Sequence, residues 1–104
     1  MHSNLTTYTL PLSDEDKLFV RFCLKKGKIA EFVLQYYTKT PKGWRTVIRY
    51  DTSHGYAHKD VYAYSKRGKI RHEAMGDEFS SIFTAALEDI KTHWKELKEN
   101  YMFQ

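Results

Sequence analysis

Hydrophobic and polar residues alternate along four segments of the chain, and turns that contain glycine separate these segments. The segments are residues 18–24, 29–38, 44–50 and 56–64. Alternation with a period of two is typical of a strand that buries one face. In the third segment it places Thr46 on the same face as Ile48 and Tyr50, with Arg49 on the other face. We therefore predict four strands.

The C-terminal third of the chain has a different period. Residues 69–75 fit a short edge strand, in which Lys69 and Arg71 would discourage pairing with another chain. From Asp77 to Tyr101, apolar residues recur every three or four positions, which predicts one long amphipathic helix. Four or five antiparallel strands followed by one helix make a two-layer α+β fold, in which the helix covers one face of the sheet and leaves the other open.

Length and composition indicate one small globular domain. A chain of 104 residues with 41% hydrophobic and 15% aromatic residues can bury one core. We expect residues 1–104 to form a single domain with a loosely ordered start over residues 1–17. No apolar run is long enough to cross a membrane, and the N-terminus lacks the features of a signal peptide, so a cytoplasmic protein is expected. The sequence leaves the oligomeric state open, a homodimer included.

The charge balance favours an anionic partner. Lysine and arginine number 17 against 13 aspartates and glutamates, which gives a net charge of +4. An excess of positive charge attracts phosphate, so RNA is a candidate partner. The same excess is also common in proteins whose charge serves only solubility.

Titratable side chains are dense in the stretch RYDTSHGYAHKD, residues 49–60. If the two flanking strands form a hairpin through DTSHG, side chains on one face of both strands converge at its end. The residues concerned are Arg49, Asp51, His54, His58 and Asp60. The rival interpretation is an ordinary polar turn, because Asp and Ser beside Gly55 are common turn residues.

Such a cluster fits ribonuclease chemistry without a metal ion. RNA cleavage requires a base that takes the proton of the 2′-hydroxyl and an acid that protonates the leaving 5′-oxygen. Histidine serves both roles near neutral pH, so His54 and His58 would share them, while Asp51 or Asp60 would orient an imidazole.

Other side chains of the motif would hold the substrate. Arg49 or Lys59 would balance the charge of the phosphate. Tyr56 would stack on a base, and Tyr62 would belong to a stacking surface on the open sheet. His72 and His93 are isolated in the sequence, and we expect no catalytic role for either.

Metal binding is the second chemistry that the motif allows. Asp51, His54, His58 and Asp60 are suitable ligands for a divalent ion. However, a His-x-x-x-His pair needs a helix to align its two rings, and Gly55 among strand-forming residues argues against a helix. We therefore assign no metal and no cofactor from the sequence.

The stretch VIRYDTSHGYAHKD resembles the signature of TumE-type toxins of bacterial and archaeal toxin-antitoxin systems and of related small proteins. In these, Arg-Tyr-Asp is followed by Gly and then by His-x-His or His-x-Asp. The matching positions are Arg49, Tyr50, Asp51, His54, Gly55, His58 and Asp60. The resemblance implies several strands before a C-terminal helix, a toxin-like role, a cognate antitoxin protein as partner, and RNA as the target class.

Two functions follow as expectations. The first is a toxin-like, metal-independent ribonuclease that uses the histidine, aspartate and arginine side chains of the hairpin. The alternative is a noncatalytic module that grips a protein or a nucleic acid through Arg49, Tyr56, Lys59 and Tyr62.

Overall fold

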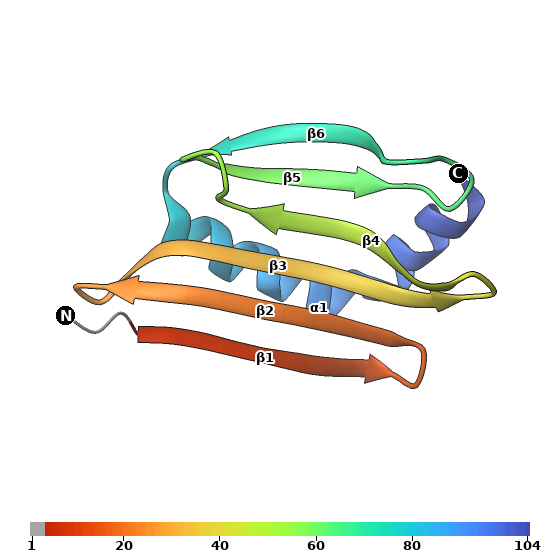
Figure 1. The fold of residues 1–104 in the computed structure, drawn as a ribbon, viewed down its shortest axis with the longest axis horizontal. Coiled ribbons are helices and arrows are strands. Elements are labelled where there is room, and N and C mark those ends of the chain that lie inside the picture. Colours follow the sequence, from red (N-terminus) through yellow and green to blue (C-terminus); the bar gives the residue numbers. More distant parts are fainter. Residues whose placement is uncertain (1–3) are drawn as a thin grey trace.

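The computed structural model of the chain describes residues 4–104, which form six strands and one helix. The elements are β1 (Asn4–Ser13), β2 (Asp16–Lys25), β3 (Lys28–Thr40), β4 (Gly43–Asp51), β5 (Ala57–Tyr62), β6 (Lys69–Gly76) and α1 (Phe79–Phe103). Each strand pairs antiparallel with the next in the sequence, so the sheet order runs from β1 to β6 (Figure 1). The predicted α+β fold is confirmed, and the predicted strands match β2 to β6 within a few residues.

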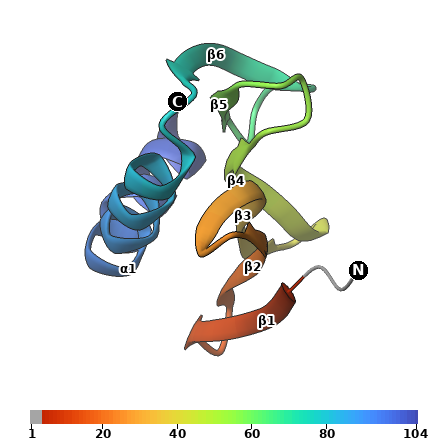
Figure 2. The same ribbon diagram turned by 90° about the vertical axis from the view of Figure 1, so that its left-hand side faces the viewer.

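The helix α1 covers one face of the sheet, as Figure 2 shows. Its apolar side packs on alternate residues of the central strands, among them Phe32 of β3 and Tyr50 of β4. The ring of Phe83 in α1 lies 5.4 Å from that of Phe32, edge to face. Because strand residues alternate between faces, Arg49 and Asp51, the neighbours of Tyr50, point to the face opposite α1. We call this the open face.

The sheet has one strand more than the sequence predicts. The expected loosely ordered start is wrong for residues 4–13, which form β1 and pair along β2, while residues 1–3 lie outside the described part of the chain. Most side chains of β1 are exposed, so it lacks the run of alternating buried apolar residues that marks β2 and β3. Pro11 is compatible with its position at the sheet edge, since a residue there needs a partner on one side only.

A β-bulge corrects the predicted faces of β4. The pairing of β3 with β4 shifts by one residue at Val47. Thr46 therefore lies on the open face, where its Oγ1 accepts a 2.6 Å hydrogen bond from Gln35 Nε2. Strict alternation places Thr46 on the face of Ile48, and that prediction is wrong because the extra residue reverses the order of the faces.

The helix begins at Phe79 and is kinked at His93, whose φ of −117° is not helical. His93 is exposed and its Nδ1 lies 3.0 Å from Asp89 Oδ1. The kink lies in the half of α1 that follows the buried Ile90. Within residues 4–104, no helix is both long enough and apolar enough to span a membrane.

Candidate functional site

The β4–β5 hairpin gathers the charged side chains of residues 49–60 on the open face. Its register places Asp51 opposite His58 and Arg49 opposite Asp60. Cross-strand partners on one face of an antiparallel pair have neighbouring side chains. The predicted hairpin is therefore present, and Arg49, Asp51, His58 and Asp60 lie together on its open face.

Asp51 is a buried carboxylate held by three residues. Its Oδ1 lies 2.7 Å from His58 Nε2 and accepts a 3.1 Å hydrogen bond from the backbone N–H of Ser53. Its Oδ2 accepts a 2.6 Å hydrogen bond from Arg49 Nε. Burial alone would raise the pKa of Asp51, but the hydrogen bonds from Arg49 and Ser53 outweigh it and hold the pKa below its usual value. Because an ionised carboxylate only accepts hydrogen bonds, Nε2 of His58 carries a proton.

The other ring nitrogen of His58, Nδ1, is buried and has no hydrogen-bond partner among the described residues. His58 itself is 3% exposed. Three rings lie beside it, with centroid distances of 5.4 Å for His54, 5.6 Å for Tyr56 and 4.9 Å for His72. In the neutral imidazole, Nδ1 holds a lone pair that can accept a proton once a covering ring moves aside.

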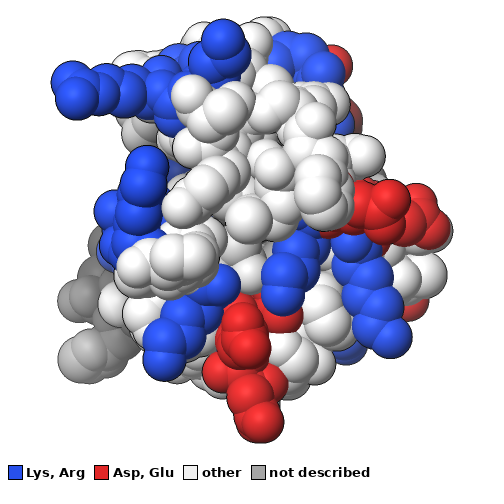
Figure 3. Space-filling model, turned by 90° about the vertical axis from the view of Figure 1, so that its right-hand side faces the viewer, with Lys and Arg blue, Asp and Glu red and all other residues white. Residues whose placement is uncertain are grey.

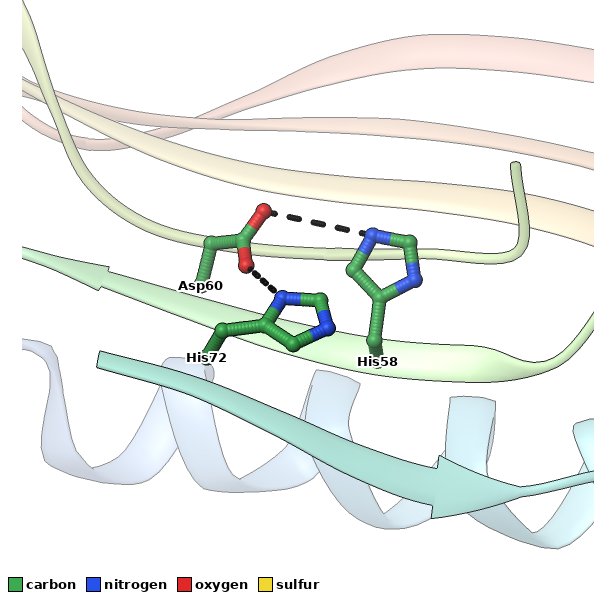
Figure 4. Close-up of side chains that lie close together, drawn as sticks. All are labelled: His58, Asp60 and His72. Atoms are coloured by element: carbon green, nitrogen blue, oxygen red, sulfur yellow. Dashed lines mark hydrogen bonds and ion pairs between the residues drawn. The ribbon is translucent and has the colours of Figure 1, made fainter. Parts of the chain in front are cut away.

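His72 joins the site from β6, and its predicted isolation is wrong. It pairs with Asp60 in the β5–β6 register, and its Nδ1 lies 2.5 Å from Asp60 Oδ1 (Figure 4). Lys69 Nζ lies 3.5 Å from the same oxygen. The His/Asp cluster, as we call Asp51, His58, Asp60 and His72 together, thus contains two imidazoles that each contact their own carboxylate.

Lys59 lies away from this cluster. It faces α1, and its Nζ lies 3.1 Å from Glu73 Oε2 and 5.8 Å from the centre of the Tyr50 ring. Its predicted role beside a phosphate at the cluster is therefore corrected, because the period of the strand turns Lys59 to the face opposite His58 and Asp60. Arg49, whose Nη1 donates a 3.0 Å hydrogen bond to Gln35 Oε1, remains on the open face.

A pocket of about 680 Å³ lies beyond the end of β5 that is farther from His58. Its lining includes Lys42, Arg45, Thr46, Tyr62, Tyr64, Lys66, Arg67 and Tyr101. We call it the basic pocket; Figure 3 shows the Lys and Arg side chains around this end of the molecule. Since Gln35 bonds both Arg49 and Thr46, a row of hydrogen bonds runs across the open face from Asp51 to the pocket.

A divalent ion has one candidate ligand set among the described residues. His58, Asp60 and His72 each offer one ligand atom, and these atoms lie within 4.8 Å of one another. The sequence suggested a different set, with His54 and Asp51 in place of His72. Nitrogen and carboxylate ligands of this kind suit zinc among the common metal ions.

Comparison with known proteins adds a family and no activity. A family model described as a domain of unknown function, DUF7718, matches residues 2–104. No curated protein and no solved structure matches the chain. Because the match extends over nearly the whole sequence, the chain belongs to the DUF7718 family.

Proposed function

We propose that this chain is a toxin-like ribonuclease that cleaves RNA without a metal ion. The observation that carries the proposal is the pair of Asp51 and His58. Asp51 fixes the proton of His58 on Nε2, at 2.7 Å, and leaves Nδ1 as a base without another partner within residues 4–104. A carboxylate that orients an imidazole in this way is the usual device for making histidine a general base.

In the proposed reaction His58 Nδ1 takes the proton of a ribose 2′-hydroxyl. The 2′-oxygen then bonds to the adjacent phosphorus, the bond from phosphorus to the 5′-oxygen breaks, and a 2′,3′-cyclic phosphate forms. His72, in its protonated form, gives a proton to the leaving 5′-oxygen. We assign this role to His72 in place of His54 because Asp60 orients its ring 4.9 Å from that of His58. Arg49 would face the charge that develops on the phosphate.

The covering rings set a condition for this reaction. His54 and Tyr56 belong to the loop between β4 and β5, and both rings lie over His58. An RNA base that stacks on Tyr56 would take the place of the neighbouring His54 ring and expose Nδ1 of His58. Substrate binding and uncovering of the base would then be one event.

The basic pocket is suited to hold the rest of the RNA strand. Its lining joins lysine and arginine to tyrosines, the combination that binds single strands through phosphate contacts and base stacking. Tyr62 follows His58 by four residues along β5, a span of about 13 Å in a strand. A single strand of a few nucleotides can thus contact both places.

The test is an RNA digestion assay with chelator present. The wild type, freed of any antitoxin, should cleave RNA, and His58→Ala and His72→Ala should each lose about a hundredfold or more in rate. His93→Ala is the matched control, since it removes an exposed His–Asp contact on α1 and should leave the rate unchanged. Equal cleavage by wild type and His58→Ala, or none by the wild type, would refute the proposal.

The alternative proposal is a noncatalytic module that binds RNA or a protein on the open face. The burial of His58 Nδ1 favours it, because the proposed base is closed to solvent. Binding that survives loss of both His58 and His72, in a protein without cleavage activity, would support this alternative. An antitoxin gene beside the gene of this chain would support the toxin setting of either function.

A further inference from the structure

We propose that His58, Asp60 and His72 form a zinc site, and that zinc held there blocks the proposed ribonuclease reaction. The second half of this inference rests on the proposed function, and the first half does not. The site uses one residue, His72, that the sequence motif does not contain.

The ligands come from two adjacent strands, which fixes their relative positions. His58 and Asp60 are two residues apart on β5 and share the open face, and His72 of β6 pairs with Asp60 (Figure 4). The nitrogen of His58 that faces Asp60 is Nε2, 3.9 Å from Asp60 Oδ2. Two ligands of a tetrahedral zinc ion lie about 3.4 Å apart, given bonds of about 2.1 Å. The separation of His58 Nε2 and Asp60 Oδ2 therefore needs only a small decrease for both atoms to bind one zinc ion.

The third ligand has the freedom that binding requires. His72 Nδ1 now lies 2.5 Å from Asp60 Oδ1, closer than two ligands of one ion. His72 is an exposed residue of the edge strand β6, whereas His58 and Asp60 are buried. Rotation of the His72 side chain can open space for the ion while the other two ligands stay in place.

The charges around the site also admit a cation. Asp51 and Asp60 are two carboxylates, 4% and 6% exposed, within one cluster. Arg49 compensates Asp51 at 2.6 Å, but the cation beside Asp60 is Lys69, at 3.5 Å and with about half of its side chain exposed. A zinc ion can replace Lys69 beside Asp60, and the lysine then returns to solvent without leaving a buried charge.

The identity of the ion follows from its ligands. Two imidazole nitrogens and one carboxylate oxygen are a common zinc set that leaves a fourth position open. Magnesium and calcium prefer oxygen ligands throughout. A further carboxylate oxygen, Asp51 Oδ1, lies 2.7 Å from the same nitrogen of His58 and can complete or support the coordination.

Zinc and the ribonuclease reaction require opposite tautomers of His58. A metal ion on Nε2 displaces the proton that Asp51 now holds there. In the neutral ring that proton must move to Nδ1, the atom that is the base in the proposed reaction. One imidazole cannot be zinc ligand and general base at once, so bound zinc should inhibit cleavage.

The binding test uses the full chain after chelator treatment, titrated with zinc and followed by calorimetry. One zinc ion per chain should bind the wild type, and His72→Ala and Asp60→Asn should each weaken binding by at least about tenfold. His93→Ala should bind as the wild type does. His72 is exposed, so its variant keeps the fold; a circular dichroism spectrum checks this. Equal binding by wild type and His72→Ala, or competition by magnesium at similar concentration, would overturn the site.

The activity test separates this inference from the proposed function. Zinc should inhibit RNA cleavage by the wild type, and chelator should reverse the inhibition. Variants that do not bind zinc should not be inhibited. This result supports both the zinc site and the proposed function. Zinc binding that leaves the cleavage rate unchanged overturns the blocking role. Cleavage that depends on zinc overturns metal-independent catalysis and keeps the site. Cleavage without any zinc binding overturns the site alone.

Discussion

Asp51 Oδ1 and His58 Nε2 lie 2.7 Å apart on neighbouring strands, and both residues are almost fully buried. The contact leaves one nitrogen of the imidazole without another partner among the described residues. It also links His58 to Arg49, which holds the other oxygen of the same carboxylate. The chemistry of the cluster therefore depends on Asp51 as much as on the histidine.

Replacement of Asp51 by asparagine should lower the RNA cleavage rate by about ten- to a hundredfold. The asparagine amide can accept from or donate to His58, so the ring is no longer held with its proton on Nε2. Glu31→Gln is the matched control, because Glu31 forms an exposed ion pair with Arg21 at 3.7 Å. Initial rates with one labelled RNA measure both variants. Equal rates in Asp51→Asn and the control would exclude Asp51 as a positioning residue.

The two lysine-rich turns of the chain should differ in their effect on RNA binding. Lys66 and Arg67 line the basic pocket, whereas Lys25 and Lys26 lie at the β2–β3 turn at the other end of the molecule (Figure 1). The double change Lys66→Gln with Arg67→Gln should reduce the slope of log affinity against log salt by about 1.4, or 0.7 for each lost phosphate contact.

The double change Lys25→Gln with Lys26→Gln removes the same charge and is the control. Fluorescence anisotropy of a short labelled single-stranded RNA over a series of salt concentrations gives both slopes. If the slope of log affinity against log salt falls equally in the two double variants, RNA is attracted by the net charge of the protein, and the basic pocket is not a specific RNA-binding site.

Gly55 should be needed for activity more than for stability. Its φ is +81°, where an alanine side chain is strained, and nothing lies within 4 Å of the added Cβ. Gly55→Ala should therefore cost about 1 kcal/mol of unfolding free energy. Gly27→Ala, at φ +75° and equally free of neighbours, should cost the same.

The two glycine variants should differ in the assay for cleavage. Gly55 joins His54 to Tyr56, whose rings cover His58, so a shift of its backbone moves both rings. We expect Gly55→Ala to lower the rate by about tenfold, and Gly27→Ala to leave it unchanged. Urea denaturation and initial rates decide this; a similar rate in both variants would show that the loop has no part in catalysis.

The sequence predicts the core of the site because that core is local. Asp51 and His58 are seven positions apart and join through one turn, so strand periodicity alone brings them to one face. The same periodicity runs along β3, where Phe32, Leu34 and Tyr36 are each at most 1% exposed. No long-range information is required for either result.

The position of His72 does not follow from strand periodicity, because it depends on a bulge. Tyr62 pairs with Lys69, and a regular hairpin would continue from there to place Arg71 opposite Asp60. The register shifts by one residue between Val61 and Tyr62, and His72 takes that position instead. A one-residue shift changes every later pair, and nothing in the local sequence fixes where it occurs.

The sequence does not predict β1, for a different reason. Its polar residues are mostly threonine, which favours strands, and this was the available signal. Its apolar residues are only partly covered, because β1 lies at the edge of the sheet, so the alternation that reveals a half-buried strand is weak. Its pairing with β2 is therefore a property of the assembled sheet.

Asp16 should make the stability of the fold depend on pH. It is 1% exposed, and its carboxylate accepts 2.6 Å hydrogen bonds from Tyr36 Oη and Ser13 Oγ and a 3.2 Å bond from Lys98 Nζ. Burial alone would raise the pKa of Asp16, but these hydrogen bonds outweigh it, so the pKa lies below its usual value. The unfolded chain therefore binds a proton at Asp16 more readily than the folded chain does.

It follows that the stabilisation from Asp16 is complete above the pKa of the unfolded chain, about 3.9, and is lost as pH falls through the lower pKa of the folded state. Asp16→Asn should reduce the unfolding free energy by about 1–3 kcal/mol near neutral pH, and the difference from wild type should shrink on acidification. Asp14→Asn, at an exposed position two residues away, should show no such change. Urea denaturation at a series of pH values measures both differences. The difference in unfolding free energy between wild type and Asp16→Asn could instead stay constant or widen in acid. That result would mean that the buried carboxylate is not ionised, and that Tyr36 and Lys98 are held there by packing alone.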